Sequence, residues 1–375
     1  MLPGFATPEF TAAFAARHIQ EQGVATGHYR TVRGLTVGSV GLGTYLGDAD
    51  AETDDSYESA VVEFVKLGGN LIDTAINYRA QRSERSIGRA LKRLEHEAVA
   101  RREELVLCTK GGYFSFDGRY PKTRKDVQDW VEKTFFETGI LQRDDVAQAC
   151  HAMSPAYLRH QIAASLGNLG VDTIDVYYLH NPETQLANLD RAGFLKRVRA
   201  AFETLEEYAA AGAIRWYGCA TWNGFRAAPT SDEYLSLEEL VAAARDIAGD
   251  GHRFRFVQLP FNLAMLEAAR FANQRVGDRL MPLFEAAHRL DITCIASASI
   301  LQGKLAQELP EAIAEAFPGL PSDALRSIQF NRSAPNLDCT LVGMGRAPHV
   351  VENMGLAKRP PAPPETVKRL LLKLA

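Results

Sequence analysis

Cysteine is scarce in this sequence, whose 375 residues contain five cysteines, an odd number at widely separated positions. Disulfide frameworks and zinc sites use paired or closely spaced cysteines. The spacing here argues against both and predicts small apolar core residues in a reducing compartment, which favours a cytoplasmic location. The five residues are Cys108, Cys150, Cys219, Cys294 and Cys339.

Long hydrophobic runs and an excess of positive charge are also missing. No segment approaches the roughly 20 apolar residues that span a bilayer, and residues 1–6 lack the features of a signal peptide, so we expect neither membrane insertion nor export. Lys and Arg number 42 against 46 Asp and Glu, and the sequence pI is near 6.2. Because clustered positive charge drives binding to nucleic acid, no nucleic-acid partner is expected.

The sequence does contain a regular alternation of short apolar runs and helical stretches. Hydrophobic residues make up 46% and charged residues 23%, which is typical of a globular enzyme. Eight runs have strand character, the number that a closed barrel requires. We therefore predict an α/β fold, a single (β/α)8 TIM barrel domain over residues 1–375. The predicted strands are residues 40–43, 70–73, 105–110, 174–180, 214–220, 256–259, 292–297 and 339–342.

Four segments depart from the repeat. Residues 1–28 form an N-terminal extension with a short helix, residues 29–37 predict a hairpin, and residues 357–375 form a C-terminal tail and helix. A fourth segment, residues 111–153, is far longer than an ordinary βα loop. Since it leaves the end of the third strand, we expect it over the active-site face, as a lid on the substrate pocket or as a surface excursion.

Helix boundaries also carry signals. The first barrel helix is expected to start at a capping region, residues 53–55, and to end at Leu67. Ser154 followed by Pro155 predicts the start of the helix after the insertion. A long amphipathic helix is predicted over residues 191–211.

Four polar residues stand at or just beyond the ends of three predicted strands, namely Asp73, Tyr78, Lys110 and His180. The carboxyl ends of parallel barrel strands share one face, so these side chains are expected to converge. A tyrosine, a lysine, a carboxylate and a histidine together predict a proton-transfer site.

The local sequence around these residues strengthens that prediction. Residues 73–78 read DTAINY and residues 83–91 read SERSIGRAL. With the ordered set of four, this stretch resembles the aldo-keto reductase superfamily, and the resemblance runs from about Leu35 to about Leu356. It implies reduction of an aldehyde or ketone to an alcohol, or the reverse, with NADP(H) favoured, NAD(H) possible and no metal.

The resemblance gives each member of the set a role. Tyr78 is the proton donor, and Lys110 favours its phenolate and lowers its pKa. Asp73 pairs with Lys110, and His180 orients the carbonyl oxygen.

The resemblance also implies a cofactor site. Residues 219–221, which end at Thr221, read Cys-Ala-Thr where the family usually has Val-Ser-Asn. Phe261 stands where the family commonly has a tyrosine that stacks on the nicotinamide. Arg346 is the expected anchor for a 2′-phosphate. The full set of cofactor-binding candidates is Gly43, Thr44, Asp73, Thr221, Gln258, Phe261, Ser297, Gly343, Arg346, Glu352 and Asn353.

The sequence is also compatible with other functions. The same fold serves as a cofactor-bound regulatory subunit, as in the potassium-channel β subunits that this family resembles. A Rossmann turn at residues 41–47 is rejected because its glycine spacing is wrong. A metal-dependent hydrolase is disfavoured because residues 40–44 contain no histidine. The expected partner is a small carbonyl or alcohol, and the sequence sets no expectation for the oligomeric state.

Overall fold

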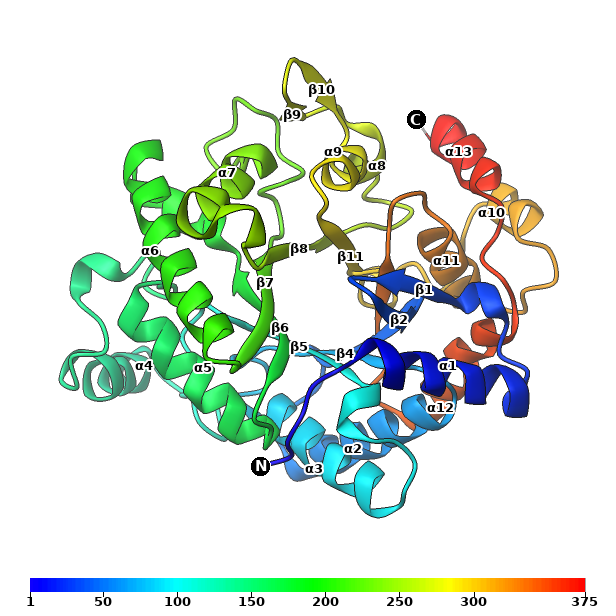
Figure 1. The fold of residues 1–375 in the computed structure, drawn as a ribbon, viewed down its shortest axis with the longest axis horizontal. Helices are drawn as coiled ribbons and strands as arrows, with labels where there is room; N and C mark the ends of the chain where they lie inside the picture. Colours follow the sequence, from blue (N-terminus) through cyan, green and yellow to red (C-terminus); the bar gives the residue numbers. More distant parts are fainter. Residues whose placement is uncertain (375) are drawn as a thin grey trace.

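The computed structural model describes residues 1–374, and its centre is a closed barrel of eight parallel strands (Figure 1). Around the barrel the order is β11, β12, β3, β4, β5, β6, β7 and β8, which confirms the predicted (β/α)8 fold. The strands are β3 (Val40–Gly43), β4 (Leu71–Asp73), β5 (Val106–Gly111), β6 (Ile174–His180), β7 (Ile214–Ala220), β8 (Phe254–Pro260), β11 (Thr293–Ser297) and β12 (Cys339–Gly343).

Alternate residues of the strands fill the barrel interior, as the two-residue period of a strand requires. The predicted hairpin is present, formed by β1 (Tyr29–Val32) and β2 (Leu35–Gly38). Its apolar residues join the interior cluster and close the amino-terminal end of the barrel. This cluster includes Val32, Leu35, Leu71, Val106, Tyr178, Trp216, Phe256 and Ile295.

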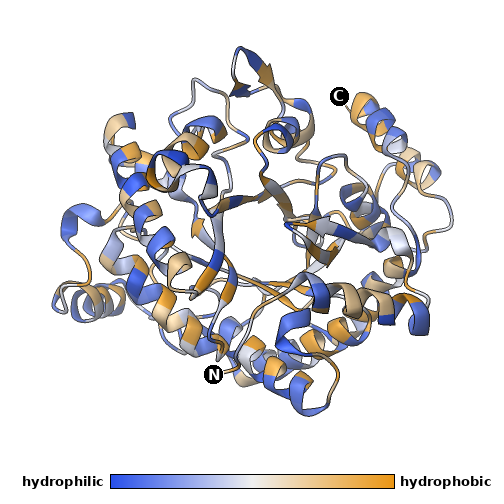
Figure 2. Cartoon of the chain, in the orientation of Figure 1, coloured by the Kyte–Doolittle hydropathy of each residue, from blue (hydrophilic) through white to orange (hydrophobic). Residues whose placement is uncertain are grey.

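Helices surround the barrel and turn their apolar faces toward the strands (Figure 2). The helices that follow the strands in chain order are α2 (Ala51–Lys66), α3 (Arg82–His96), α5 (Pro155–Leu169), α6 (Arg191–Ala210), α7 (Leu237–Ala248), α9 (Leu283–Arg289), α11 (Asp323–Arg332) and α12 (Ala347–Met354). Outside this ring lie α1 (Pro8–Gln22), the hairpin of β9 (Gln274–Val276) and β10 (Arg279–Met281), and α13 (Pro364–Lys373).

Of the three helices with predicted starts, two begin where predicted and one does not, and the predicted end of the first barrel helix at Leu67 is confirmed by its C-cap. Helix α5 begins at Pro155 with Ser154 as its N-cap, and α6 covers the predicted amphipathic stretch. Helix α2 begins before the expected capping region, because Asp50 is its N-cap and its side chain accepts the Thr53 amide at 2.8 Å. Several residues between 48 and 55 have side chains suited to capping, so composition alone does not select among them.

The insertion after β5 is folded rather than extended. It contains α4 (Arg124–Val131), a π-helical turn (Glu132–Phe136) and a 3₁₀ turn (Arg143–Asp145). Its apolar side chains form a small core of their own on Tyr157 of α5, and Phe135 at its centre has no exposed surface. Among residues 1–374, no helix is long and apolar enough to cross a membrane.

Candidate active site

The strand ends bring the Asp73 and Lys110 side chains together at the carboxyl-terminal mouth of the barrel. Lys110 Nζ lies 2.5 Å from Asp73 Oδ1 and donates to the Thr74 carbonyl at 2.7 Å. The second carboxylate oxygen of Asp73 accepts the side-chain amide of Gln258 at 2.8 Å. Both ions are almost fully buried, so each depends on these partners for its charge.

Tyr78 and His180 complete the predicted set. Tyr78 follows β4 in a turn, and Lys110 Nζ lies 5.0 Å from the centre of its ring. His180 ends β6, and its ring meets the Tyr78 ring edge-on with 5.8 Å between centroids. The structure thus assembles all four predicted residues in one place, and we refer to Asp73, Tyr78, Lys110 and His180 as the tetrad.

Charge in this group is set by burial and by the lysine. Burial lowers the pKa of Lys110, but Asp73 and Tyr78 outweigh it and the net shift is upward, so Lys110 is a cation. Burial, followed by the Lys110 cation, lowers the pKa of His180 well below its ordinary value. His180 is therefore a neutral imidazole at pH 7, and its buried Nδ1 has no hydrogen-bond partner within residues 1–374.

The pKa of Tyr78 differs in direction from the prediction. Burial raises it above the ordinary value of a tyrosine, and the Lys110 cation opposes burial without overcoming it. The sequence identified the lysine effect but not the size of the desolvation, which depends on packing around the ring. The result is a protonated phenol at neutral pH, the form that donates a proton.

His151, in the insertion, is a site residue that sequence reasoning missed. Its ring is buried, its Nε2 lies 2.8 Å from the main-chain oxygen of His180, and its Nδ1 lies 2.8 Å from the Gln185 side-chain amide. The amide donates, so Nε2 carries the proton that the His180 carbonyl accepts. Burial lowers the pKa of His151 to about 4, which keeps it neutral. A side chain at Gly112 would meet His151 Nε2 at 2.7 Å, so a glycine is needed there.

Several predicted cofactor residues line the same mouth. Gly43 and Gly343 pair at the ends of β3 and β12, and a side chain at Gly343 would meet only Leu46 at 3.9 Å. The Thr44 hydroxyl donates to the Asp73 carbonyl at 3.2 Å. Glycines at two adjacent strand ends leave open space at the mouth of the barrel, and we call this surface the glycine floor.

The next strand ends contribute Thr221, Gln258 and Ser297. Thr221 is held by its amide, which donates to the Gln258 carbonyl at 2.8 Å, while its buried hydroxyl has no partner in the described chain. Ser297 ends β11 and is half-buried. An unpaired buried hydroxyl at this mouth fits an amide group of a nicotinamide, since buried hydroxyls are normally hydrogen-bonded.

Phe261 lies deeper than expected. Its ring has no exposed surface and packs between Phe330, stacked at 5.6 Å, and Phe284, edge-on at 5.0 Å. To stack on a nicotinamide, this ring would have to move out of its contacts with Phe284 and Phe330. The sequence could not reveal these contacts.

The predicted adenine end lies at α12. Arg346 is its exposed N-cap residue, and Glu352 is exposed and accepts the Ser322 hydroxyl at 2.7 Å. Asn353 is buried on the same helix. The side chain of Arg346 is therefore accessible to an anion at the start of α12.

A cavity of about 280 Å³ opens above Tyr78. Its walls are mostly aromatic, and most of its lining comes from the insertion. None of its lining residues carries a full charge. They are Tyr45, Asn77, Tyr78, Tyr113, Phe114, Phe116, Tyr120, Val127, Ala149 and Cys150. A larger groove of about 920 Å³ lies elsewhere and includes none of the tetrad. No cluster of three or more potential metal ligands occurs in residues 1–374.

The chain is a (β/α)8 barrel in which the tetrad lies at the carboxyl-terminal mouth. Residues 39–314 match the model of the Aldo/keto reductase family. The chain belongs to this family.

Two curated relatives are similar over part of their length. The NADH-specific methylglyoxal reductase of Escherichia coli (strain K12) is 29% identical over 211 residues, which are 55% of this chain and 54% of that protein. The D-threo-aldose 1-dehydrogenase of Pseudomonas sp is 29% identical over 187 residues, 49% of this chain and 50% of that protein. The chain spans about half the length of the curated relatives it matches.

Solved structures show the same fold. An aldo/keto reductase from Klebsiella pneumoniae in complex with NADP and acetate has a TM-score of 0.60 at 18% identity, covering 92% of this chain and 94% of that one. An aldo-keto reductase from Bacillus halodurans in its holo form has a TM-score of 0.62 at 18% identity, covering 92% and 96%.

Proposed function

We propose that this protein is an NAD(P)H-dependent reductase that converts an aldehyde or ketone to an alcohol, with Tyr78 as the general acid. The observation that carries the proposal is the position of Tyr78, which lines a cavity and lies beside a buried Lys110–Asp73 pair and a neutral His180. Family membership supports it.

Each residue has a defined task in this reaction. When bound, the nicotinamide supplies the hydride. Tyr78 holds its proton until a carbonyl oxygen gains negative charge, and the Lys110 cation stabilises the phenolate left behind. Asp73 keeps Lys110 charged and in place. His180, neutral and edge-on to Tyr78, orients the carbonyl oxygen.

The cofactor is held by residues at the strand ends and at α12. The nicotinamide end of the cofactor lies on the glycine floor of Gly43 and Gly343 and is surrounded by Thr44, Thr221, Gln258 and Ser297. Arg346 takes the 2′-phosphate near Glu352 and Asn353, which favours NADP(H) because an arginine can grip a phosphate with two donors. NAD(H) stays a second candidate, since the relative from Escherichia coli is described as NADH-specific.

The cavity suggests the substrate. Aromatic walls without a full charge suit a neutral carbonyl compound with an apolar or planar body. The insertion supplies most of these walls and acts as a lid that selects substrates.

The function is tested with a panel of neutral and charged carbonyls, each with NADPH and NADH, followed by loss of nicotinamide absorbance. Turnover of neutral aldehydes or ketones supports the proposal. Tight binding of NADPH without turnover of any member contradicts it and favours a regulatory subunit.

A further inference from the structure

A left-handed turn directly follows the proton donor. Arg79, Ala80 and Gln81 have φ values of 51°, 54° and 69°, and this is the longest run of positive φ at non-glycine residues within residues 1–374. A side chain in this region crowds the following carbonyl oxygen, which makes the conformation costly. Such strain persists where the surrounding structure enforces it, and it gathers at functional sites.

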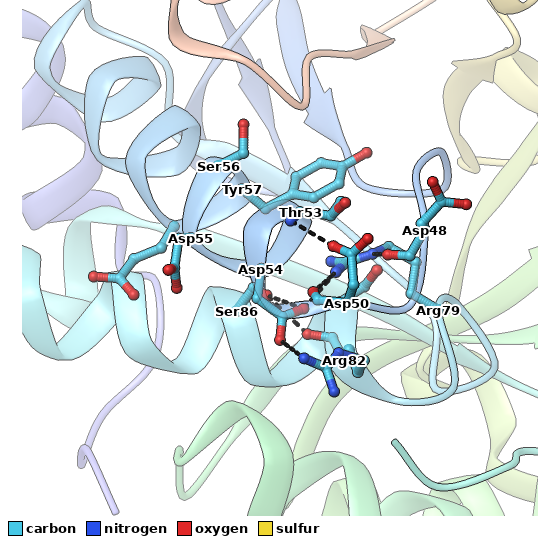
Figure 3. Close-up of polar contacts among 12 residues, drawn as sticks. Asp48, Asp50, Thr53, Asp54, Asp55, Ser56, Tyr57, Arg79, Arg82 and Ser86 are labelled. Carbon is cyan, nitrogen blue, oxygen red and sulfur yellow. Dashed lines mark hydrogen bonds and ion pairs between the residues drawn. The ribbon is translucent and has the colours of Figure 1, made fainter. Parts of the chain in front are cut away.

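Ion pairs to a buried carboxylate hold both ends of the turn (Figure 3). Arg79 has a side chain only 1% exposed, and its Nη2 donates to the carboxylate of Asp54 on α2. Arg82, just after the turn, places its Nη2 2.5 Å from the other Asp54 oxygen. One carboxylate therefore holds the first residue of the turn and the first residue of α3.

The Arg79 guanidinium also grips the loop after β3. Its Nε donates to the Asp48 carbonyl at 2.8 Å, its Nη2 donates to the Asp50 carbonyl at 3.2 Å, and its carbon lies 5.2 Å from the centre of the Tyr57 ring. The planar fork of arginine suits several acceptors at once, which a lysine cannot reproduce.

The same loop reaches Tyr78 from the other side. Tyr45 packs edge-on against the Tyr78 ring with 5.0 Å between centroids, and Ser83 of α3 donates to the Thr44 carbonyl at 2.9 Å. Arg79 thus links the loop that packs on Tyr78 to the turn that follows Tyr78, and Asp54 holds the Arg79 guanidinium in place.

We propose that Asp54 and Arg79 are positioning residues that hold the left-handed turn in its strained conformation. They thereby fix the position and orientation of the Tyr78 hydroxyl. The proposal rests on the proposed function, in which Tyr78 donates the proton. Neither residue touches the reacting atoms. Preorganisation of this kind acts on turnover, because a misplaced donor loses reactive geometry while the cavity and the cofactor floor stay as they are.

The test compares kcat, KM and thermal stability for NADPH-dependent reduction of benzaldehyde. Asp54→Asn keeps the volume of the side chain and removes its charge. We expect kcat to fall about 10-fold to 100-fold, with KM for benzaldehyde and Kd for NADPH within about twofold of the parent. Arg79→Lys, which keeps the positive charge but loses the fork, is expected to give the same pattern and serves if Asp54→Asn does not fold.

A rescue variant separates positioning from simple stability. Glycine adopts the left-handed conformation without the steric cost, so Ala80→Gly removes strain that the ion pair otherwise has to oppose. Ala80→Gly alone is expected to have near-parent kcat. Added to Asp54→Asn, it is expected to recover at least about a third of the parent kcat if strain drives the loss.

The matched control is Asp175→Asn. Asp175 forms a comparable buried pair with Arg102 at 2.7 Å, but it lies at the start of β6, at the opposite end of that strand from His180. We expect this variant to lose thermal stability and keep kcat at a temperature where it is folded.

Parent kcat in folded Asp54→Asn or Arg79→Lys, or no recovery by Ala80→Gly, would overturn the proposal. Tyr78→Phe is measured alongside: parent kcat in that variant defeats the proposed function itself, whereas an inactive Tyr78→Phe with a fully active Asp54→Asn defeats only the positioning role.

Discussion

His151 Nε2 donates to the main-chain oxygen of His180 at 2.8 Å, so a residue of the insertion holds the backbone of a tetrad member. The Gln185 side chain fixes the His151 tautomer, and Arg197 donates to Gln185 in turn. Tyr113 packs edge-on against both histidines, at 5.2 Å and 5.1 Å. The insertion and the tetrad are therefore joined by hydrogen bonds as well as by packing.

This link predicts the effect of changing His151. His151→Phe keeps an aromatic ring but removes the donor, leaving the buried His180 carbonyl unpaired, which costs about 1–3 kcal/mol. We expect reduced stability and a kcat about tenfold lower. His151→Gln retains an N–H donor and is expected to recover part of both, as measured by thermal denaturation and steady-state kinetics. Equal kcat in the parent and both variants would contradict the link.

The buried Lys110–Asp73 pair predicts that its effects on stability and on activity can be separated. Lys110→Met leaves Asp73 buried without its partner, which should cost about 3–5 kcal/mol of unfolding free energy. Adding Asp73→Asn should restore much of that stability, because the uncompensated charge is gone. Activity should stay low in both variants, since neither has a cation beside Tyr78. Denaturant unfolding and kcat measured on the same samples check this, and a double variant with parent kcat would refute the role of Lys110.

The raised pKa of Tyr78 predicts opposite pH profiles for the two reaction directions. Reduction needs the protonated phenol, which persists through neutral and mildly alkaline pH because burial raises the pKa above its ordinary value. We expect kcat for reduction to be flat from pH 7 to about 9. Alcohol oxidation needs the phenolate and should rise with pH over the same range. Initial rates in both directions test this, and a reduction rate that falls with a midpoint near neutral pH would contradict it.

Arg346 predicts cofactor preference. Arg346→Ala should raise Kd for NADPH by about 10-fold or more and change Kd for NADH little, because a charge-assisted bond to the 2′-phosphate is worth about 1.5–3 kcal/mol. Fluorescence titration with both cofactors measures it. Equal weakening of both cofactors would show that Arg346 does not recognise this phosphate.

The proposed role of the insertion as a lid predicts substrate selection. Phe116→Ala opens the cavity wall and should raise KM for benzaldehyde several-fold while leaving KM for propanal nearly unchanged. Phe136→Ala serves as the control, since Phe136 belongs to the same insertion but does not line the cavity. A shift shared equally by both substrates, or by both variants, would make the insertion a structural support rather than a selective lid.

The fold was predictable because each barrel strand is a short apolar run and parallel strands place their ends together. The same rule predicted that Asp73, Lys110 and His180 converge at one mouth of the barrel, and this prediction required no distances. His151 was not predictable, because its partner is a backbone carbonyl 29 residues away. Asp54 and Arg79 resemble solvent-exposed charges in the sequence, and only the packing of α2 on the turn buries them. The depth of Phe261 likewise depends on rings contributed by α9 and α11.

The role of Tyr78 as proton donor is tested most directly by kcat for benzaldehyde reduction by Tyr78→Phe at saturating NADPH, with Kd for NADPH measured on the same sample. The variant removes only the phenolic hydroxyl. We predict that kcat falls by roughly 10²–10⁴ while Kd stays within about twofold of the parent. A kcat close to that of the parent would contradict the assignment of Tyr78 as the proton donor.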